Sequence, residues 1–149
     1  MGDISKNFSW SELTVTNHNI PNIPNEDQKK NIEDLVINVL QPLRDLAGVS
    51  INVNSGFRSP AVNKKVGGAS TSQHCANKGA AADLMCIKKS NAEIFKIIKD
   101  KLPFDQLIWE FGTDKEPSWV HVSYNAKNNR KQILKARKNK LGKTVYENI

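Results

Sequence analysis

The chain has no long hydrophobic run and few cysteines. No apolar stretch approaches the ~20 residues that a transmembrane helix needs, so we expect no stable membrane insertion. Residues 1–5 show no positive region followed by an apolar core, which predicts that no secretory signal peptide is present. The two cysteines, Cys75 and Cys86, lack CxxC spacing, and we expect free thiols rather than a disulfide framework.

Acidic residues are also fewer than basic ones: the chain has 15 Asp and Glu and 22 Lys and Arg. The resulting net charge of +7 favours an anionic partner such as nucleic acid, an anionic cell envelope or a membrane surface. Much of the excess falls late in the chain, where a solvated basic segment is at least as good an interpretation as a binding patch. No aromatic residues alternate with these charges, so we expect no nucleic-acid partner. The basic residues concerned are Lys127, Arg130, Lys131, Lys135, Arg137, Lys138, Lys140 and Lys143.

A length of 149 residues predicts a single domain, with an N-terminal helix and irregular arm over 1–25 and a basic C-terminal segment over 126–149. Apolar spacing predicts a long helix after Asn25 that is kinked at Pro42 and ends at Gly48. Short helices are expected over 7–13 and 61–66, and a longer one over 90–101. Strands are expected over 50–54, 81–87, 106–111 and 119–124, the last two as an antiparallel hairpin. Beyond 125 only a weak helix or strand is indicated.

Two histidines and one aspartate are the main chemical signal. His74 lies in a loop, while Asp83 and His121 lie on predicted strands. Two imidazoles and one carboxylate form a ligand set that Zn²⁺ accepts, and three protein ligands leave a fourth position open for water. Cys75 follows His74 directly and is a rival ligand.

Several ordered blocks carry a resemblance to a known family. The run Asn54-Ser55-Gly56-Phe57-Arg58-Ser59-Pro60-Ala61-Val62-Asn63 resembles a block of the zinc D-Ala-D-Ala carboxypeptidase family, whose members include phage endolysins. Ser72-Gln73-His74, Gly79-x-Ala81-x-Asp83 and Trp119-Val120-His121 resemble its zinc blocks in their usual order. The resemblance implies the zinc DD-peptidase (Hedgehog-like) fold: an α+β domain with helices packed on a mainly antiparallel sheet. Relatives usually place two residues between the first histidine and the glycine, whereas four stand here, so this loop should bulge.

The resemblance also implies roles for individual residues. His74, Asp83 and His121 would hold Zn²⁺, and Arg58 would bind the carbonyl oxygen of the bond that is cut. A guanidinium suits an oxyanion because it offers fixed donors and full charge, although Arg58 could instead brace its own turn. Ser72 and Gln73 would hydrogen-bond either the substrate or a metal ligand.

The general base needs a separate argument. Some relatives carry an acid three residues before the last histidine, or a histidine two before it, and here these positions hold Ser118 and Trp119. Alternation over 106–111 places Leu107, Trp109 and Phe111 on one face and Glu110 on the other. A carboxylate on the strand beside His121 can reach a water at the metal, so Glu110 is the predicted base. Asp114 and Glu116, in the following turn, are its rivals.

These inferences predict a zinc metallopeptidase that hydrolyses a D-Ala-D-Ala or L-Ala-D-Glu bond in the peptidoglycan stem peptide. Such an enzyme would be a monomer, made in the cytoplasm and acting on the wall after release, as a phage endolysin does. One alternative is a zinc-containing wall-binding module without turnover, favoured by the missing acid before His121. A basic nucleic-acid-binding protein is the remaining alternative, and only net charge supports it.

Overall fold

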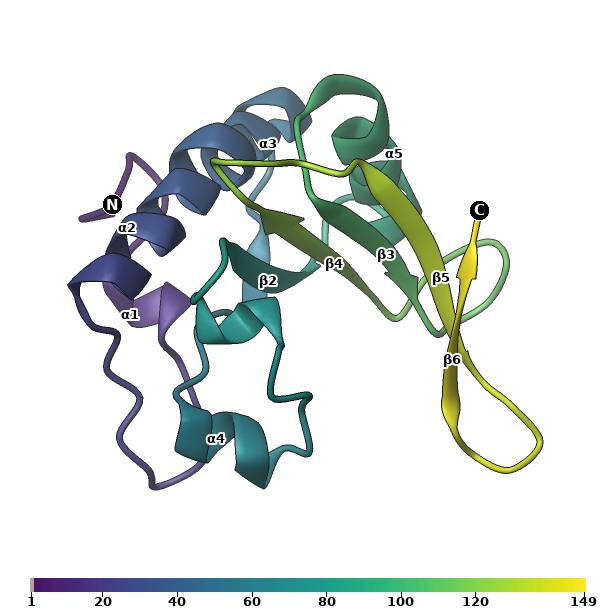
Figure 1. The fold of residues 1–149 in the computed structure, drawn as a ribbon. Helices are drawn as coiled ribbons and strands as arrows, with labels where there is room; N and C mark the ends of the chain where they lie inside the picture. The colour runs from purple at the N-terminus through teal and green to yellow at the C-terminus, as the bar shows by residue number, and fades with distance from the viewer. Residues whose placement is uncertain (1) are drawn as a thin grey trace.

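The computed structural model describes residues 2–149, and a six-stranded sheet runs through it (Figure 1). The strand order is β1-β2-β4-β3-β5-β6. Neighbouring strands pair antiparallel except β3 and β5, which are parallel. The expected α+β class with a mainly antiparallel sheet is therefore confirmed. The strands are β1 Asn52–Ser55, β2 Ala80–Met85, β3 Gln106–Glu110, β4 Trp119–Tyr124, β5 Gln132–Lys138 and β6 Thr144–Asn148.

Helices lie mainly on one side of this sheet, as Figure 1 shows for α2, α3 and α5. Side-chain caps begin several of them at the positions that the sequence indicates. Ser9 accepts a hydrogen bond from the Glu12 backbone, and Ser90 forms a capping box with Glu93. The helices are α1 Trp10–Leu13, α2 Glu26–Leu35, α3 Gln41–Ala47, α4 Pro60–Lys65 and α5 Asn91–Lys101, with a 3₁₀ turn η2 at Gln73–Cys75. None of the helices within 2–149 is long and apolar enough to cross a bilayer.

The long helix predicted after Asn25 is present but is divided by a π-helical turn, η1 Val36–Leu40. Proline has no backbone N–H, so Pro42 removes one regular helical hydrogen bond at this point. The Gln41 N–H bonds to the Val36 carbonyl, five residues back. The predicted kink at Pro42 therefore takes the form of a wider turn. Gly48 then ends α3 in the left-handed conformation at φ 68°.

Alternation along the strands gives the sheet two different faces. Leu84, Leu107, Val120 and Val122 are fully buried against the helices. Residues between them point to the opposite face, which carries the polar groups described below. Cross-strand pairing joins Asp83 to His121, His121 to Ile108, and Ile108 to Leu134, so this row runs across four strands on one face.

The basic C-terminal segment forms part of the sheet. Its strands β5 and β6 make an antiparallel hairpin that extends the sheet at the end opposite to α1 (Figure 1). The sequence indicates only a weak helix or strand beyond residue 125, and the structure has two strands there. Several of its cations are paired with acids, among them Arg130 with Asp105 and Lys135 with Asp114.

The face predicted for Phe111 is wrong. Strand β3 ends at Glu110, and Phe111 takes a positive φ of 56°, which breaks the alternation. Its ring packs with Ile108, Leu134 and Ala136 rather than with Leu107 and Trp109. Phe111 therefore lies on the polar face of the sheet, beside the site.

Candidate metal centre and cleft

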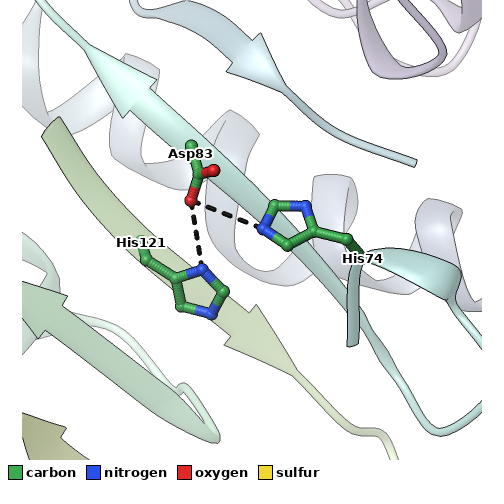
Figure 2. A group of neighbouring side chains, drawn as sticks. All are labelled: His74, Asp83 and His121. Atoms are coloured by element: carbon green, nitrogen blue, oxygen red, sulfur yellow. Dashed lines mark hydrogen bonds and ion pairs between the residues drawn. The ribbon is translucent and has the colours of Figure 1, made fainter. Parts of the chain in front are cut away.

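The fold brings His74, Asp83 and His121 together, although 47 positions separate the first from the last in sequence (Figure 2). Asp83 and His121 face each other across β2 and β4, and His74 reaches them from the 3₁₀ turn η2. Asp83 Oδ1 lies 3.4 Å from His74 Nε2 and 3.1 Å from His121 Nδ1. One ligand atom from each residue lies within 4.8 Å of the other two.

These separations fit a tetrahedral zinc ion. Bonds of ~2.0–2.2 Å at tetrahedral angles put neighbouring ligand atoms ~3.3–3.6 Å apart. The two oxygen–nitrogen distances, 3.4 and 3.1 Å, lie at or just below this spacing, and all three side chains are largely removed from solvent. The donor set and these distances are therefore compatible with the ion that the sequence predicts.

The His74 ring is held in one orientation by the backbone. Its Nδ1 lies 2.8 Å from the Gly56 carbonyl oxygen, so Nδ1–H donates and Nε2 turns its lone pair toward Asp83. The backbone N–H of Arg58 in turn donates to the His74 carbonyl oxygen at 2.8 Å. A side chain at position 56 would meet the Leu13 carbonyl oxygen at 2.5 Å, so only glycine fits there. The Ser-Gly-Phe-Arg block thus positions the predicted ligand His74 directly.

The loop after His74, which is longer than in relatives, is held by hydrogen bonds at several points. Ser72 Oγ accepts from the His74 N–H, and Ala76 adopts a left-handed φ of 58°. Asn31 on α2 then donates to the Ala76 carbonyl at 2.7 Å, and Gln28 donates to the Asn77 side chain at 3.1 Å. The longer loop is therefore fastened to α2 by contacts of Asn31 and Gln28.

Charge in the centre is carried by Asp83. Burial acts to raise the pKa of this carboxyl, but the neighbouring His74 and His121 outweigh that effect and hold the pKa well below its usual range. Asp83 is therefore ionised at neutral pH, which is the form that binds metal.

A cleft of about 730 Å³ opens over the three residues. One wall is the loop 67–74 with Arg58, and the other is formed by β3 and the C-terminal hairpin. The Arg58 Nε is buried and has no hydrogen-bond partner within residues 2–149. A Cβ on Gly68 would approach Arg58 Nη1 to 3.2 Å, so glycine lets this loop pack close to the guanidinium. Arg58 thus lines the cleft and keeps one buried donor, its Nε, without a partner within residues 2–149.

Glu110 lines the same cleft and is 8% exposed. Burial raises its pKa to about 7, the His121 ring acts to lower it, and the Asp83 charge adds to the rise. The two rival acids lie elsewhere. Glu116 accepts a hydrogen bond from the Asn91 N–H at the start of α5, and Asp114 pairs with Lys135 on the surface. Of the three acids considered, only Glu110 lines the cleft.

Ser72 and Gln73 also line the cleft, but their side chains have partners within the protein. Ser72 caps the turn that carries His74. Gln73 donates to Asp105 Oδ2 at 2.8 Å, and its own Oε1 is buried without a partner. Asp105 also binds the Arg130 guanidinium through both oxygens, at 2.8 and 2.9 Å. This network fastens the His74 turn to the beginning of the C-terminal hairpin.

Sequence reasoning missed two contributions to the site. The Gly56 carbonyl orients His74, and Asp105 holds Gln73. The Ser-Gly-Phe-Arg block marks Gly56 as part of the site but does not mark its carbonyl as the partner of His74, and no pattern marks Asp105. Cys75, the rival ligand, is buried away from the ligand atoms, and burial raises the pKa of its thiol. Cys75 and Cys86 are both free thiols.

A three-residue nitrogen and oxygen centre below an open cleft, with a guanidinium and a carboxyl beside it, defines a metallopeptidase type of site. The sequence model of the family Peptidase M15 matches residues 6–123, and the chain belongs to this family. The family is zinc-dependent, which agrees with the donor set. No curated protein matches the chain.

Proposed function

We propose that this metallopeptidase hydrolyses a peptide bond in the stem peptide of bacterial peptidoglycan, with Zn²⁺ held by His74, Asp83 and His121. The observation that carries the proposal is that Glu110 and Arg58 share one cleft with the three ligand residues. When bound there, Zn²⁺ would supply Lewis-acid activation of water and of the scissile carbonyl.

Glu110 is the proton carrier in this proposal. Its carboxylate takes a proton from the attacking water and returns it to the nitrogen of the leaving amine. The carboxyl is shielded from bulk solvent and has no hydrogen-bond partner within the described residues, so both oxygens are free for this work. The acid that is missing before His121 is thereby replaced from the neighbouring strand β3.

Arg58 stabilises the negative charge that develops on the carbonyl oxygen. Its position is set by the backbone hydrogen bond to His74 and by the close approach of Gly68. A preorganised donor of this kind acts without reorganisation during the reaction. Ser72 and Gln73 serve mainly to position the His74 turn and present the adjacent wall to the substrate.

Mass spectrometry of purified peptidoglycan digested with zinc-loaded protein tests the proposal and identifies the bond. Free D-Ala would identify a D-Ala-D-Ala carboxypeptidase, and a new N-terminal D-Glu would identify an L-Ala-D-Glu endopeptidase. A phage endolysin and a bacterial carboxypeptidase both fit this chemistry. Full zinc content without any cleavage would contradict the proposal and leave a wall-binding module.

A further inference from the structure

The C-terminal hairpin contributes to the cleft although it lies outside the part of the chain that the family match covers. The match ends at residue 123, whereas Leu134, Thr144 and Tyr146 all line the cleft. The hairpin is also fastened to the site, because Asp105 binds both Arg130 and Gln73. The wall that it forms is therefore a feature of this chain in addition to the matched region.

Register places Tyr146 in the same row as Glu110. Glu110 on β3 pairs with Ala136 on β5, and Ala136 pairs with Tyr146 on β6. Paired residues point to the same face, and neighbouring strands are ~4.8 Å apart, so the two Cβ atoms are separated by ~10 Å. The residue between them is Ala136, which is fully buried, and Glu110 and Tyr146 both line the cleft.

The Tyr146 hydroxyl is free to bind something else. No hydrogen bond from it is found within residues 2–149, and the residue is 56% exposed although it lines the cleft. Burial of the phenol, with the nearby carboxylates of Glu110 and Asp83, raises its pKa above the ordinary value. The phenol is therefore protonated at neutral pH and can donate a hydrogen bond.

We propose that Tyr146 contacts the substrate, with its ring forming the hairpin wall of the cleft and its hydroxyl donating to a main-chain carbonyl of the bound peptide. This inference rests on the proposed function, because it takes a stem peptide as the ligand. It adds a binding residue on the hairpin side, opposite to Arg58, and makes the hairpin a determinant of which peptide is accepted.

The test compares kcat and KM for zinc-loaded wild type, Tyr146→Phe and Tyr146→Ala on a soluble muropeptide. Tyr146→Phe keeps the ring and loses one hydrogen bond, so KM should rise about three- to tenfold with kcat nearly unchanged. Tyr146→Ala should raise KM further, because the ring contact is also lost. Val145→Ala is the matched control, since its side chain neighbours Tyr146 on β6 but points to the other face.

Normal KM values for both Tyr146 variants would overturn the inference, and so would a loss confined to kcat. An equal defect in Val145→Ala would also overturn it, because the hairpin would then act only through its fold. If Tyr146→Ala fails to fold, the KM of Tyr146→Phe alone decides whether the inference holds. If wild type binds the muropeptide without cleaving it, the proposed function fails and the same series is judged by Kd from calorimetry. Absence of binding by wild type would overturn both.

Discussion

Residues 1–125 and residues 126–149 differ sharply in charge. The first part contains 14 basic and 14 acidic residues, whereas the second contains eight basic residues and only Glu147 as an acid. The C-terminal segment thus accounts for the whole net charge of +7. The first part holds the three predicted ligand residues, Arg58 and Glu110, and contains the family match.

The difference indicates that the two parts have separate functions in one fold, catalysis in residues 1–125 and association with the substrate in residues 126–149. The electrically balanced part builds a centre in which the Asp83 charge has defined neighbours in His74 and His121. The hairpin adds a wall to the cleft and carries cations near its turn, where Lys140 and Lys143 have no acid partner within residues 2–149. Chemistry should therefore respond to changes in the first part, and association with a large anionic substrate to changes in the second.

The largest effect is expected from His121→Ala. This change removes one of three ligands, so bound zinc should fall from about one ion per chain to near zero, and hydrolysis should be lost. Metal analysis after dialysis measures the bound zinc, and digestion of purified cell wall measures hydrolysis. His18→Ala is the control, because His18 lies on the irregular arm and its hydrogen bonds within residues 2–149 involve only its backbone. Full zinc occupancy in His121→Ala would remove His121 from the centre.

Glu110→Gln should bind zinc normally and be nearly inactive. Gln keeps the size of the side chain but cannot take a proton from water, and loss of a general base typically lowers rates ~10²–10⁴-fold. Glu116→Gln is the matched control, because its remaining carbonyl oxygen can still accept from the Asn91 N–H. An active Glu110→Gln with an inactive Glu116→Gln would move the base to the turn.

Arg58→Lys should keep the fold and the metal and lose ~10²–10³ in kcat, as removal of one oxyanion donor typically does. Lysine keeps the charge but has no planar fork of donors. Zinc content and circular dichroism control for the centre and the fold. Nearly normal turnover would assign Arg58 to bracing its turn instead.

Local signals in the sequence were sufficient for the α-helices and strands between Ser9 and Tyr124, though not for the turns η1 and η2. Caps such as Ser9, Asn25 and Ser90 act within three residues, and alternation fixes which side of a strand is buried, so both can be read without the fold. The three ligand residues were predicted from their motifs, and the structure brings them together.

Other features depend on contacts that no short pattern records. The parallel pairing of β5 with β3 joins residues 26 positions apart, and many of the hairpin's residues are charged, so its strands were only weakly indicated. The face of Phe111 was wrong because one positive φ ends the alternation. The Gly56 carbonyl could not be identified as the partner of His74, since every residue has the same carbonyl group.

Asp105→Asn should loosen the connection between the two parts. Asp105 is 2% exposed and binds both Arg130 and Gln73, so its loss should lower the free energy of unfolding by about 1–3 kcal/mol. Hydrogen bonds from Arg130 hold the pKa of Asp105 below its usual range against the effect of burial. The stabilisation is therefore present above the unfolded pKa of ~3.9 and is lost as the pH falls below it. Urea titrations at pH 7 and pH 3 should show the difference between variant and wild type shrinking at low pH. A constant difference would mean that the charge of Asp105 contributes nothing.

The smallest effect is expected from the double change Lys140→Gln and Lys143→Gln. It lowers the net charge from +7 to +5 at the hairpin turn, away from every predicted ligand and proton carrier. Turnover of a soluble muropeptide should be unchanged, because exposed charges at this distance are screened by salt. Association with an intact anionic wall should weaken a few-fold at low salt, and the difference should vanish as salt is raised.

The matched control is Lys88→Gln with Lys96→Gln, which removes the same charge from exposed positions in the balanced part. If both double variants lose wall binding equally, net charge alone matters and its concentration in the hairpin has no role in binding. If only the hairpin variant weakens, the two parts divide chemistry from association as their charges suggest.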